Sequence, residues 1–126
     1  MAGTAAILAR DDDEHPIPPE IHPIFRQIVD AFLAGDWQLD SPGIPGVQPV
    51  DAETADWMAA NVRDYGSALA PLDAATWQRS VYHWMDGYWD FLVDLSMVDE
   101  AVSDLALQAR YREDSGMFEV RSIYVP

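Results

Sequence analysis

The hydrophobic pattern has a helical period in the first half of the chain. Between residues 23 and 35, apolar side chains recur every four residues in two adjacent rows, Ile24, Ile28, Phe32 and Phe25, Val29, Leu33. Such rows form one stripe on an amphipathic helix. Pro23 suits the first helical position, where its missing N–H costs nothing, and Gly35 is a natural stop. The pattern therefore predicts one helix over this segment.

A second helix is predicted after the Pro- and Gly-rich loop Asp40–Pro49. Asp51 suits the N-cap, and the negative charge of Glu53 in the first turn is favourable near the positive end of the helix dipole. Gly66 ends the segment, and Asp73 is placed to cap a further turn through Trp77. One face of the helix is apolar or aromatic and carries Met58, Val62 and Tyr65.

From residue 78 onward the pattern changes to a period of two, which is typical of strands. The Asp86-Gly87 pair is the strongest hairpin signal, because a type I′ turn needs positive φ at both positions. The predicted fold class is α+β, with two N-terminal helices packed on one face of a four-stranded antiparallel meander. Its strands are Gln78–Met85, Tyr88–Leu95, Asp104–Arg112 and Met117–Val125.

A two-residue loop at Asp86-Gly87 determines the register of the first hairpin. One face, predicted to lie under the helices, carries the pairs Trp84–Trp89 and Tyr82–Phe91. The other face carries the pairs His83–Asp90 and Arg79–Asp94. Opposite charges thus fall across from each other, which supports this register.

The second hairpin has two possible registers. A three-residue loop places Glu119 and Arg121 on the core face, whereas the four-residue loop Glu113–Gly116 pairs Arg110 with Glu119. We favour the second, because buried unpaired charge is expensive. Its core face groups Leu105, Leu107, Ala109 and Tyr111 with Phe118, Val120, Ser122 and Tyr124. The apolar residues left on the outer face are Val81, Met85, Tyr88, Leu92 and Ile123.

Composition adds a strong charge signal. The 126 residues include 22 Asp or Glu and seven basic residues, all Arg, for a formal net charge of −15. That field repels nucleic acid and anionic membranes, and it either attracts a basic protein or only keeps the chain soluble. Residues 1–20 are expected to be a flexible acidic, Pro-rich arm, mobile over Met1–Asp13, and residues 21–126 a single domain. Without a long apolar run or a cysteine, the chain is expected to be cytoplasmic and free of disulfides.

Candidate chemistry is sparse. His83 and Asp90 are a possible acid/base pair, but no nucleophile accompanies them, so no catalytic residue is assigned. His15, His22 and His83 lack the spacing of metal ligands, and no phosphate- or dinucleotide-binding motif is present. We therefore expect no metal and no cofactor.

The remaining candidate is an interaction surface around the Ser96–Ser103 loop. The loop carries Asp99 and Glu100, and Asp94 and Asp104 flank it. We expect these carboxylates to contact a partner. Tyr88 and Trp89 are candidate anchors, Trp89 the weaker because the predicted register buries it.

Several stretches resemble a family of small acidic bacterial proteins of unassigned function. The resemblance is carried by "HPIFRQIVDAFLAGDW", "VRDYGSALAPL", "SVYHWMDGYWDFLVDL", "SDLALQARYRED" and "MFEVRSIYVP", and covers roughly residues 21–126. The chain departs from the family pattern at "SMVDEAVSDL". The resemblance implies no catalytic residue. In size and acidity the family is similar to immunity proteins of bacterial toxin systems, including contact-dependent growth inhibition.

Three functions remain open from the sequence. The first is an immunity or antitoxin-like protein that binds a basic toxin domain through its acidic surface. The second is a small-ligand or enzymatic domain with a pocket between helices and sheet, lined by Trp57, Tyr82 and Trp84. The third is a homodimeric domain without catalytic activity. A flat acidic face favours the first, and a deep pocket with inward polar groups favours the second.

Overall fold

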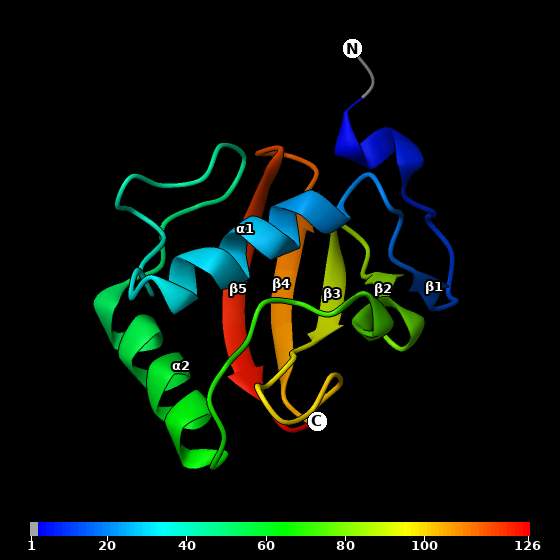
Figure 1. The fold of residues 1–126 in the computed structure, drawn as a ribbon. Coiled ribbons are helices and arrows are strands. Elements are labelled where there is room, and N and C mark those ends of the chain that lie inside the picture. The colour runs from blue at the N-terminus through cyan, green and yellow to red at the C-terminus, as the bar shows by residue number, and fades with distance from the viewer. Residues whose placement is uncertain (1–2) are drawn as a thin grey trace.

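The computed structural model describes residues 3–126 and contains one antiparallel sheet in the order β1-β2-β3-β4-β5. Helix α1 (His22–Leu33) crosses one face of the sheet, and helix α2 (Ala52–Asp64) lies along the β5 edge (Figure 1). Two 3₁₀ turns, η1 (Thr4–Ile7) and η2 (Ala74–Gln78), accompany them. The strands are β1 (His15–Pro16), β2 (Val81–Trp84), β3 (Tyr88–Asp94), β4 (Ala106–Arg112) and β5 (Met117–Tyr124).

The predicted four-stranded meander is wrong by one strand. Strand β1 comes from the N-terminal arm and pairs with β2, with His15 opposite Tyr82 and Pro16 opposite Val81. The Pro-rich sequence of this segment argues against ladder pairing. A proline is nevertheless tolerated on an edge strand, where its missing N–H faces away from the sheet. The α+β class and the order of the other four strands agree with the prediction.

Both helices form where the sequence predicts them. The carboxylate of Asp51 accepts the Thr54 N–H at 2.7 Å and so caps α2. Asp73 caps η2 in the same way, by accepting the Ala75 N–H at 2.9 Å. Each cap satisfies a backbone donor that the first turn leaves free.

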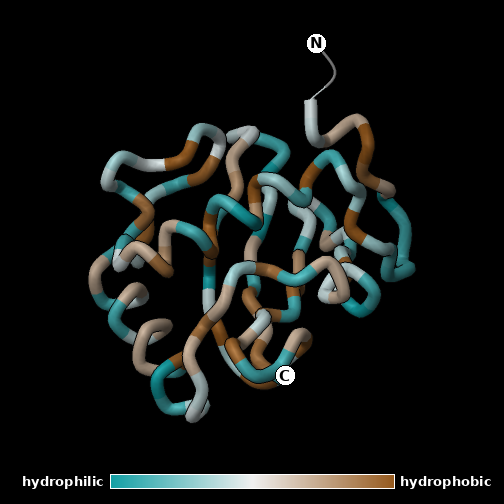
Figure 2. Tube along the Cα trace, viewed as in Figure 1, coloured by the Kyte–Doolittle hydropathy of each residue, from teal (hydrophilic) through white to brown (hydrophobic). Residues whose placement is uncertain are grey.

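An aromatic cluster joins α1 to the sheet. The ring centroid of Phe25 on α1 lies 5.6 Å from that of Phe91 and 5.7 Å from that of Phe118. Tyr111 lies 4.8 Å from Phe118 on the neighbouring strand. Apolar positions recur along the strands and both helices (Figure 2), and the most buried of them meet in this layer. Rings at these separations contribute beyond the area that they bury.

The register of the first hairpin is confirmed. Trp84 pairs with Trp89 and His83 with Asp90. The turn residues Asp86 and Gly87 have φ values of 54° and 128°. Positive φ at both positions matches the hairpin turn that the Asp-Gly pair predicts.

The second hairpin begins in the predicted register and then departs from it. Arg110 pairs with Glu119, as expected, but a β-bulge follows, because Arg121 on β5 is an extra residue opposite the Gln108–Ala109 step of β4. Beyond the bulge Leu107 pairs with Ile123, which is fully buried. The expected core positions Ser122 and Tyr124 are only half-buried, and Ile123 is not an outer-face residue. The extra residue of a bulge shifts the alternation by one, and this reverses the faces of the last residues of β5.

The N-terminal arm packs on the sheet from Leu8 onward. Leu8 and Ile17 are buried, whereas the four consecutive carboxylates Asp11–Glu14 are exposed. Fast amide exchange over the arm stays a prediction, but these contacts place the segment without a partner. Met1 and Ala2, the start of the stretch expected to be mobile, lie outside the described residues.

Candidate interaction surfaces

The structure separates the residues predicted to bind a partner. Asp99, Glu100 and Asp104 are exposed and lie at one end of the sheet. Asp94 pairs with Arg79, its Oδ2 lying 2.9 Å from the guanidinium Nε, so its charge is already balanced. Trp89 is fully buried and is not available as a surface anchor. The predicted set is therefore reduced to three free carboxylates, with Tyr88 farther away along β3.

The three free carboxylates gather around the residue that follows α2. The Tyr65 hydroxyl donates to Glu100 Oε1 at 2.8 Å and accepts the Asp104 N–H at 3.2 Å. Ser67 Oγ donates to Asp99 Oδ1 at 2.5 Å. We call these five residues the acidic corner. Hydroxyls hold the carboxylates of Asp99 and Glu100, and Asp104 is held through its backbone N–H, so a partner would meet charges on an ordered backbone.

Buried serines hold the backbone of the corner loop. Ser103 Oγ donates to the Leu95 carbonyl at 2.7 Å, and Ser96 Oγ donates to the Ala101 carbonyl at 2.7 Å. Both serine side chains are almost completely buried. The loop also accepts backbone hydrogen bonds from the segment after α2, where Ala70 N–H donates to the Ser96 carbonyl. Satisfied buried polar groups of this kind define a single loop conformation.

Electrostatics makes the acidic corner unfavourable in isolation. It lies at the C-terminus of α2, the negative end of the helix dipole, where added negative charge is destabilising. Within residues 3–126, Asp99, Glu100 and Asp104 form no ion pair. The Asp104 N–H lowers the pKa of Tyr65, but the bond to Glu100, burial and the two carboxylate charges outweigh it and raise that pKa. The corner thus carries uncompensated negative potential.

A hollow of about 390 Å³ adjoins the acidic corner. Tyr65 belongs to both, and the exposed Val125 lies at the mouth of the hollow. Apolar surface next to carboxylates suits a lysine or arginine, whose stem is apolar and whose head is charged. The lining residues are Asn61, Asp64, Tyr65, Leu105, Tyr124 and Val125.

The helix-free face of the sheet carries the predicted acid/base residues. His83 and Asp90 are cross-strand neighbours, but their side chains take different partners. Asp90 Oδ1 accepts from Gln108 Nε2 at 3.1 Å, and His83 Nε2 lies 3.1 Å from the Asp12 carbonyl. The imidazole therefore contacts the arm, and the carboxylate is part of a polar network on the sheet.

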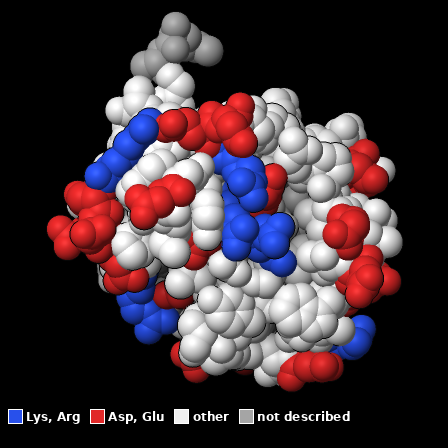
Figure 3. Space-filling view, turned by 180° about the vertical axis from the view of Figure 1, so that it is seen from behind, with Lys and Arg blue, Asp and Glu red and all other residues white. Residues whose placement is uncertain are grey.

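Two arginines stand near the middle of this helix-free face. The Arg110 guanidinium lies 4.5 Å from the ring centroid of Tyr88, and that of Arg112 lies 5.8 Å from it. Arg112 also bonds Glu119, at 3.1 Å, whereas the buried Nε of Arg110 has no hydrogen-bond partner within the described residues. Figure 3 shows basic side chains at the centre of the face and acidic ones towards its margin. The ring of Tyr88 therefore packs against the guanidinium groups of Arg110 and Arg112.

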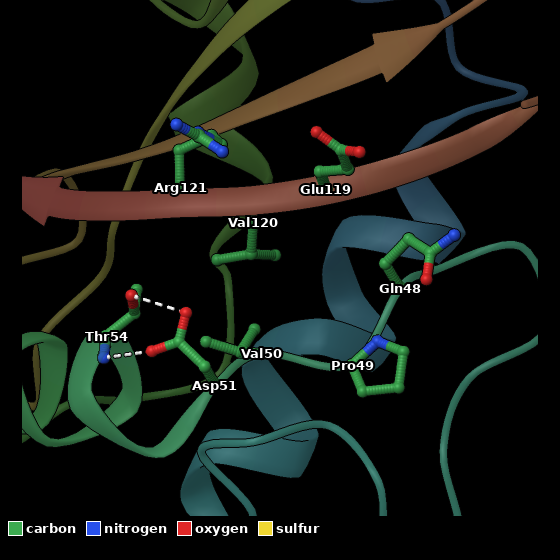
Figure 4. Close-up of a pocket in the computed structure, with 8 residues that line it drawn as sticks. All are labelled: Gln48, Pro49, Val50, Asp51, Thr54, Glu119, Val120 and Arg121. Atoms are coloured by element: carbon green, nitrogen blue, oxygen red, sulfur yellow. Dashed lines mark hydrogen bonds between the residues drawn. The ribbon is translucent and has the colours of Figure 1, made fainter. Parts of the chain in front are cut away.

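A further hollow, of about 420 Å³, lies between β5 and the start of α2 (Figure 4). Asp51 lines it, but its carboxylate already accepts two hydrogen bonds from Thr54. These bonds, the backbone one first, lower the pKa of Asp51. Glu119 and Arg121 project to the opposite side of β5 from Val120 in Figure 4. The polar groups do not converge on one point, so the hollow has no evident chemistry.

The pocket expected between the helices and the sheet is absent in the predicted form. Trp57 is half exposed on α2, at the β5 edge. Tyr82 and Trp84 are on β2, near the opposite edge of the sheet, and Tyr82 is buried under the arm. These three side chains therefore do not line one cavity.

Among residues 3–126, no three His, Cys, Asp or Glu side chains are grouped to hold a metal ion. Neither α-helix of the same range has the length and apolar character that a membrane crossing needs.

The sequence alone does not point to Tyr65 and Ser67 as surface residues. Tyr65 was expected on the apolar face of α2, but it lies just past the helix end and contacts residues 35 and 39 positions later. The sequence does contain one signal: Tyr65 and Ser67, on either side of Gly66, each carry a hydroxyl that can donate a hydrogen bond to a carboxylate.

Comparison with known proteins identifies a family but no activity. The family described as "Domain of unknown function (DUF7668)" matches residues 29–126. Neither the curated proteins nor the solved structures gave a match. The matched range includes the acidic corner and excludes the N-terminal arm.

Proposed function

This chain belongs to the DUF7668 family, whose function is unknown, and we propose that it is a cytoplasmic immunity or antitoxin-like protein. It would bind a basic toxin domain through the acidic corner and occlude the active site of that toxin. The observation that carries the proposal is the group Asp99, Glu100 and Asp104, which is bonded to Tyr65 and Ser67 and forms no ion pair within the described chain.

The cost of the acidic corner supports a role in binding. Carboxylates at a helix C-terminus do not stabilise the free protein, so their benefit must come from another source. A cationic partner would remove the mutual repulsion and satisfy the helix dipole together. The net charge of −15 would also speed its approach.

The adjoining hollow adds an apolar component. A lysine or arginine of the toxin would lay its stem against Leu105 and Tyr124 and direct its head towards Asp64 and Glu100. Binding would then combine steering by charge, which sets the association rate, with apolar burial, which slows dissociation.

The test begins with co-purification of the products of neighbouring genes and continues with binding kinetics at two salt concentrations. The triple variant Asp99→Asn, Glu100→Gln, Asp104→Asn keeps the shape of the corner and removes its charge. We expect its association rate to fall about tenfold at low salt and to depend less on salt than that of the wild type.

The matched control is Glu20→Gln, Asp30→Asn, Asp56→Asn, which removes the same charge from exposed positions elsewhere. If both triple variants slow association equally, the association rate depends on the net charge of the chain and not on the position of the acidic corner. If no basic partner is found and the corner variant is unchanged in every assay, the proposal is wrong.

A homodimer is the second candidate, and the helix-free sheet face favours it. This face offers Tyr88 and Leu92, half-buried, beside Arg110, whose Nε lacks a partner in the described chain. Acidic residues at the margin of the same face would meet the arginines of a second copy in a two-fold arrangement. Sedimentation of the wild type and of Arg110→Gln distinguishes a dimer through this face from a monomer.

A further inference from the structure

The N-terminal arm is held by side chains of the sheet at one residue. The Ala9 N–H donates to the Tyr82 hydroxyl at 2.8 Å, and the Ala9 carbonyl accepts from Trp89 Nε1 at 2.8 Å. Both the backbone donor and the backbone acceptor of Ala9 are therefore bonded to aromatic side chains, and not to a neighbouring strand. Such contacts recognise an extended backbone whatever its side chain is.

The next residue of the arm supplies a specific side chain. The Arg10 guanidinium lies 5.3 Å from the ring centroid of Trp84 and 5.1 Å from that of Trp89. It also forms an ion pair with Glu113 in the loop between β4 and β5. A guanidinium close to the faces of two indoles and paired with a carboxylate is a combination that favours arginine over lysine.

The strand residues Tyr82, Trp84 and Trp89, together with Glu113 of the β4–β5 loop, form what we call the arginine cradle. All four lie within the part of the chain that the family matches, whereas Ala9 and Arg10 lie outside it. The arm is in this sense a ligand that the chain carries on its own N-terminus. About half of the Arg10 side chain is exposed, so the guanidinium can leave without opening the core.

We propose that the arginine cradle is a peptide-binding site for an extended, arginine-containing segment of a partner protein, and that the arm occupies it until the partner arrives. The partly exposed carboxylate of Glu113 belongs to the β4–β5 loop and stays in place when the arm leaves, so it favours a cationic segment. This site is separate from the acidic corner, and its existence does not depend on the function proposed above.

The intramolecular arm is a strong competitor, because a tethered ligand acts at a millimolar effective concentration. The experiment therefore uses the full chain carrying Leu8→Ala and Arg10→Ala, which weakens the arm without removing it. The probes are three synthetic peptides, acetyl-Leu-Ala-Arg-amide and its lysine and alanine versions. Binding is followed by the Trp89 indole N–H resonance and by tryptophan fluorescence.

We expect the arginine peptide to bind the double variant about tenfold more tightly than the wild type, because the arm no longer competes effectively. The lysine version should bind about fivefold more weakly, since an ammonium is more strongly hydrated and has no planar face to lay on an indole. Adding Glu113→Gln should weaken the arginine peptide and leave the alanine version unchanged. Arg26→Ala, at an exposed position on α1, is the control and should bind like the wild type.

Two results would overturn the proposal. In one, the double variant is folded by circular dichroism but does not distinguish the three peptides. In the other, the arginine peptide binds without moving the Trp89 indole resonance, which would place it elsewhere. Because the probes are synthetic, either result leaves the function proposed for the acidic corner untouched.

Discussion

Two acidic, irregular segments of this protein are fixed in opposite ways. In the N-terminal arm the sheet holds the backbone, through Tyr82 and Trp89, and the carboxylates Asp11–Glu14 are left exposed. In the acidic corner, hydroxyls hold the carboxylates themselves, and buried Ser103 holds the backbone. Only the corner lies within the range that the family matches.

The difference shows what each segment is suited to do. At Ala9 the sheet holds backbone groups only, so another extended chain could form the same two bonds, whereas Leu8 and Arg10 are held through their side chains. A loop whose backbone bonds are buried cannot be replaced, but it presents its charges in a fixed arrangement. The arm therefore resembles a bound ligand, and the acidic corner resembles a preformed half of an interface.

Among the substitutions that test this comparison, Trp89→Ala should have the largest effect on the free energy of unfolding. Loss of a fully buried indole is expected to lower the free energy of unfolding by about 3–5 kcal/mol. Trp89→Phe keeps most of the packing, loses the bond to Ala9 and should cost about 1–3 kcal/mol. Urea denaturation measures both, and amide exchange should rise in the arm before it rises in the loop 96–104. Equal acceleration in the two segments would show that the arm is not fixed independently.

Ser103→Ala should have an intermediate effect, confined to the acidic corner. The variant leaves the Leu95 carbonyl with the Ser103 N–H as its donor but removes the acceptor of the buried Leu105 N–H, which is expected to cost about 1–3 kcal/mol. Exchange in the loop 96–104 should increase while the arm is unchanged. Ser67→Ala, whose hydroxyl bonds only the exposed Asp99, is the control and should cost less. If Ser67→Ala lowered the free energy of unfolding more than Ser103→Ala, then the exposed hydroxyl, and not the buried one, would hold the loop.

The smallest expected effect is on the pH dependence of stability. The arm and the acidic corner should each lose stability in a different pH range. The hydrogen bond from His15 and then the Asp13 N–H lower the pKa of Asp11, so its contribution is present above about pH 4 and is lost as pH falls through the folded value. The raised pKa of Tyr65 has the opposite sign, so its contribution is present below about pH 10 and is lost as pH rises through the folded value.

Urea midpoints across the pH range check this expectation. Asp11→Asn should flatten the acid side of the stability curve only, and Tyr65→Phe the alkaline side only. If each variant changes both sides, or neither, the two groups are not responsible for the pH dependence.

Local signals in the sequence were enough to predict most of the sheet. Asp86-Gly87 determines the register of β2 and β3, and charge pairing identifies Arg110 opposite Glu119. Strand β1 was missed because two residues are too few for a period, and one of them is Pro16. The bulge was missed although a signal existed, since the apolar phase changes from Val120 to Ile123 across Arg121.

The candidate sites were less predictable than the fold. Asp99, Glu100 and Asp104 were identified by charge alone, and the structure does bring them together. The residues that order them are about 30 to 40 positions away, and a local pattern does not reveal such pairings. The arginine cradle was likewise hidden, because it joins Arg10 to tryptophans more than 70 positions later.

The β-bulge in β5 permits a change in length at one position. Arg121 is the residue of β5 that has no partner on β4, so its loss would restore a regular ladder and still leave Ser122 opposite Gln108 and Ile123 opposite Leu107. Both substitution and deletion of the exposed Arg121 should therefore leave Ile123 in the core. Homologous chains are expected to vary at this position in the identity of the residue and also in its presence.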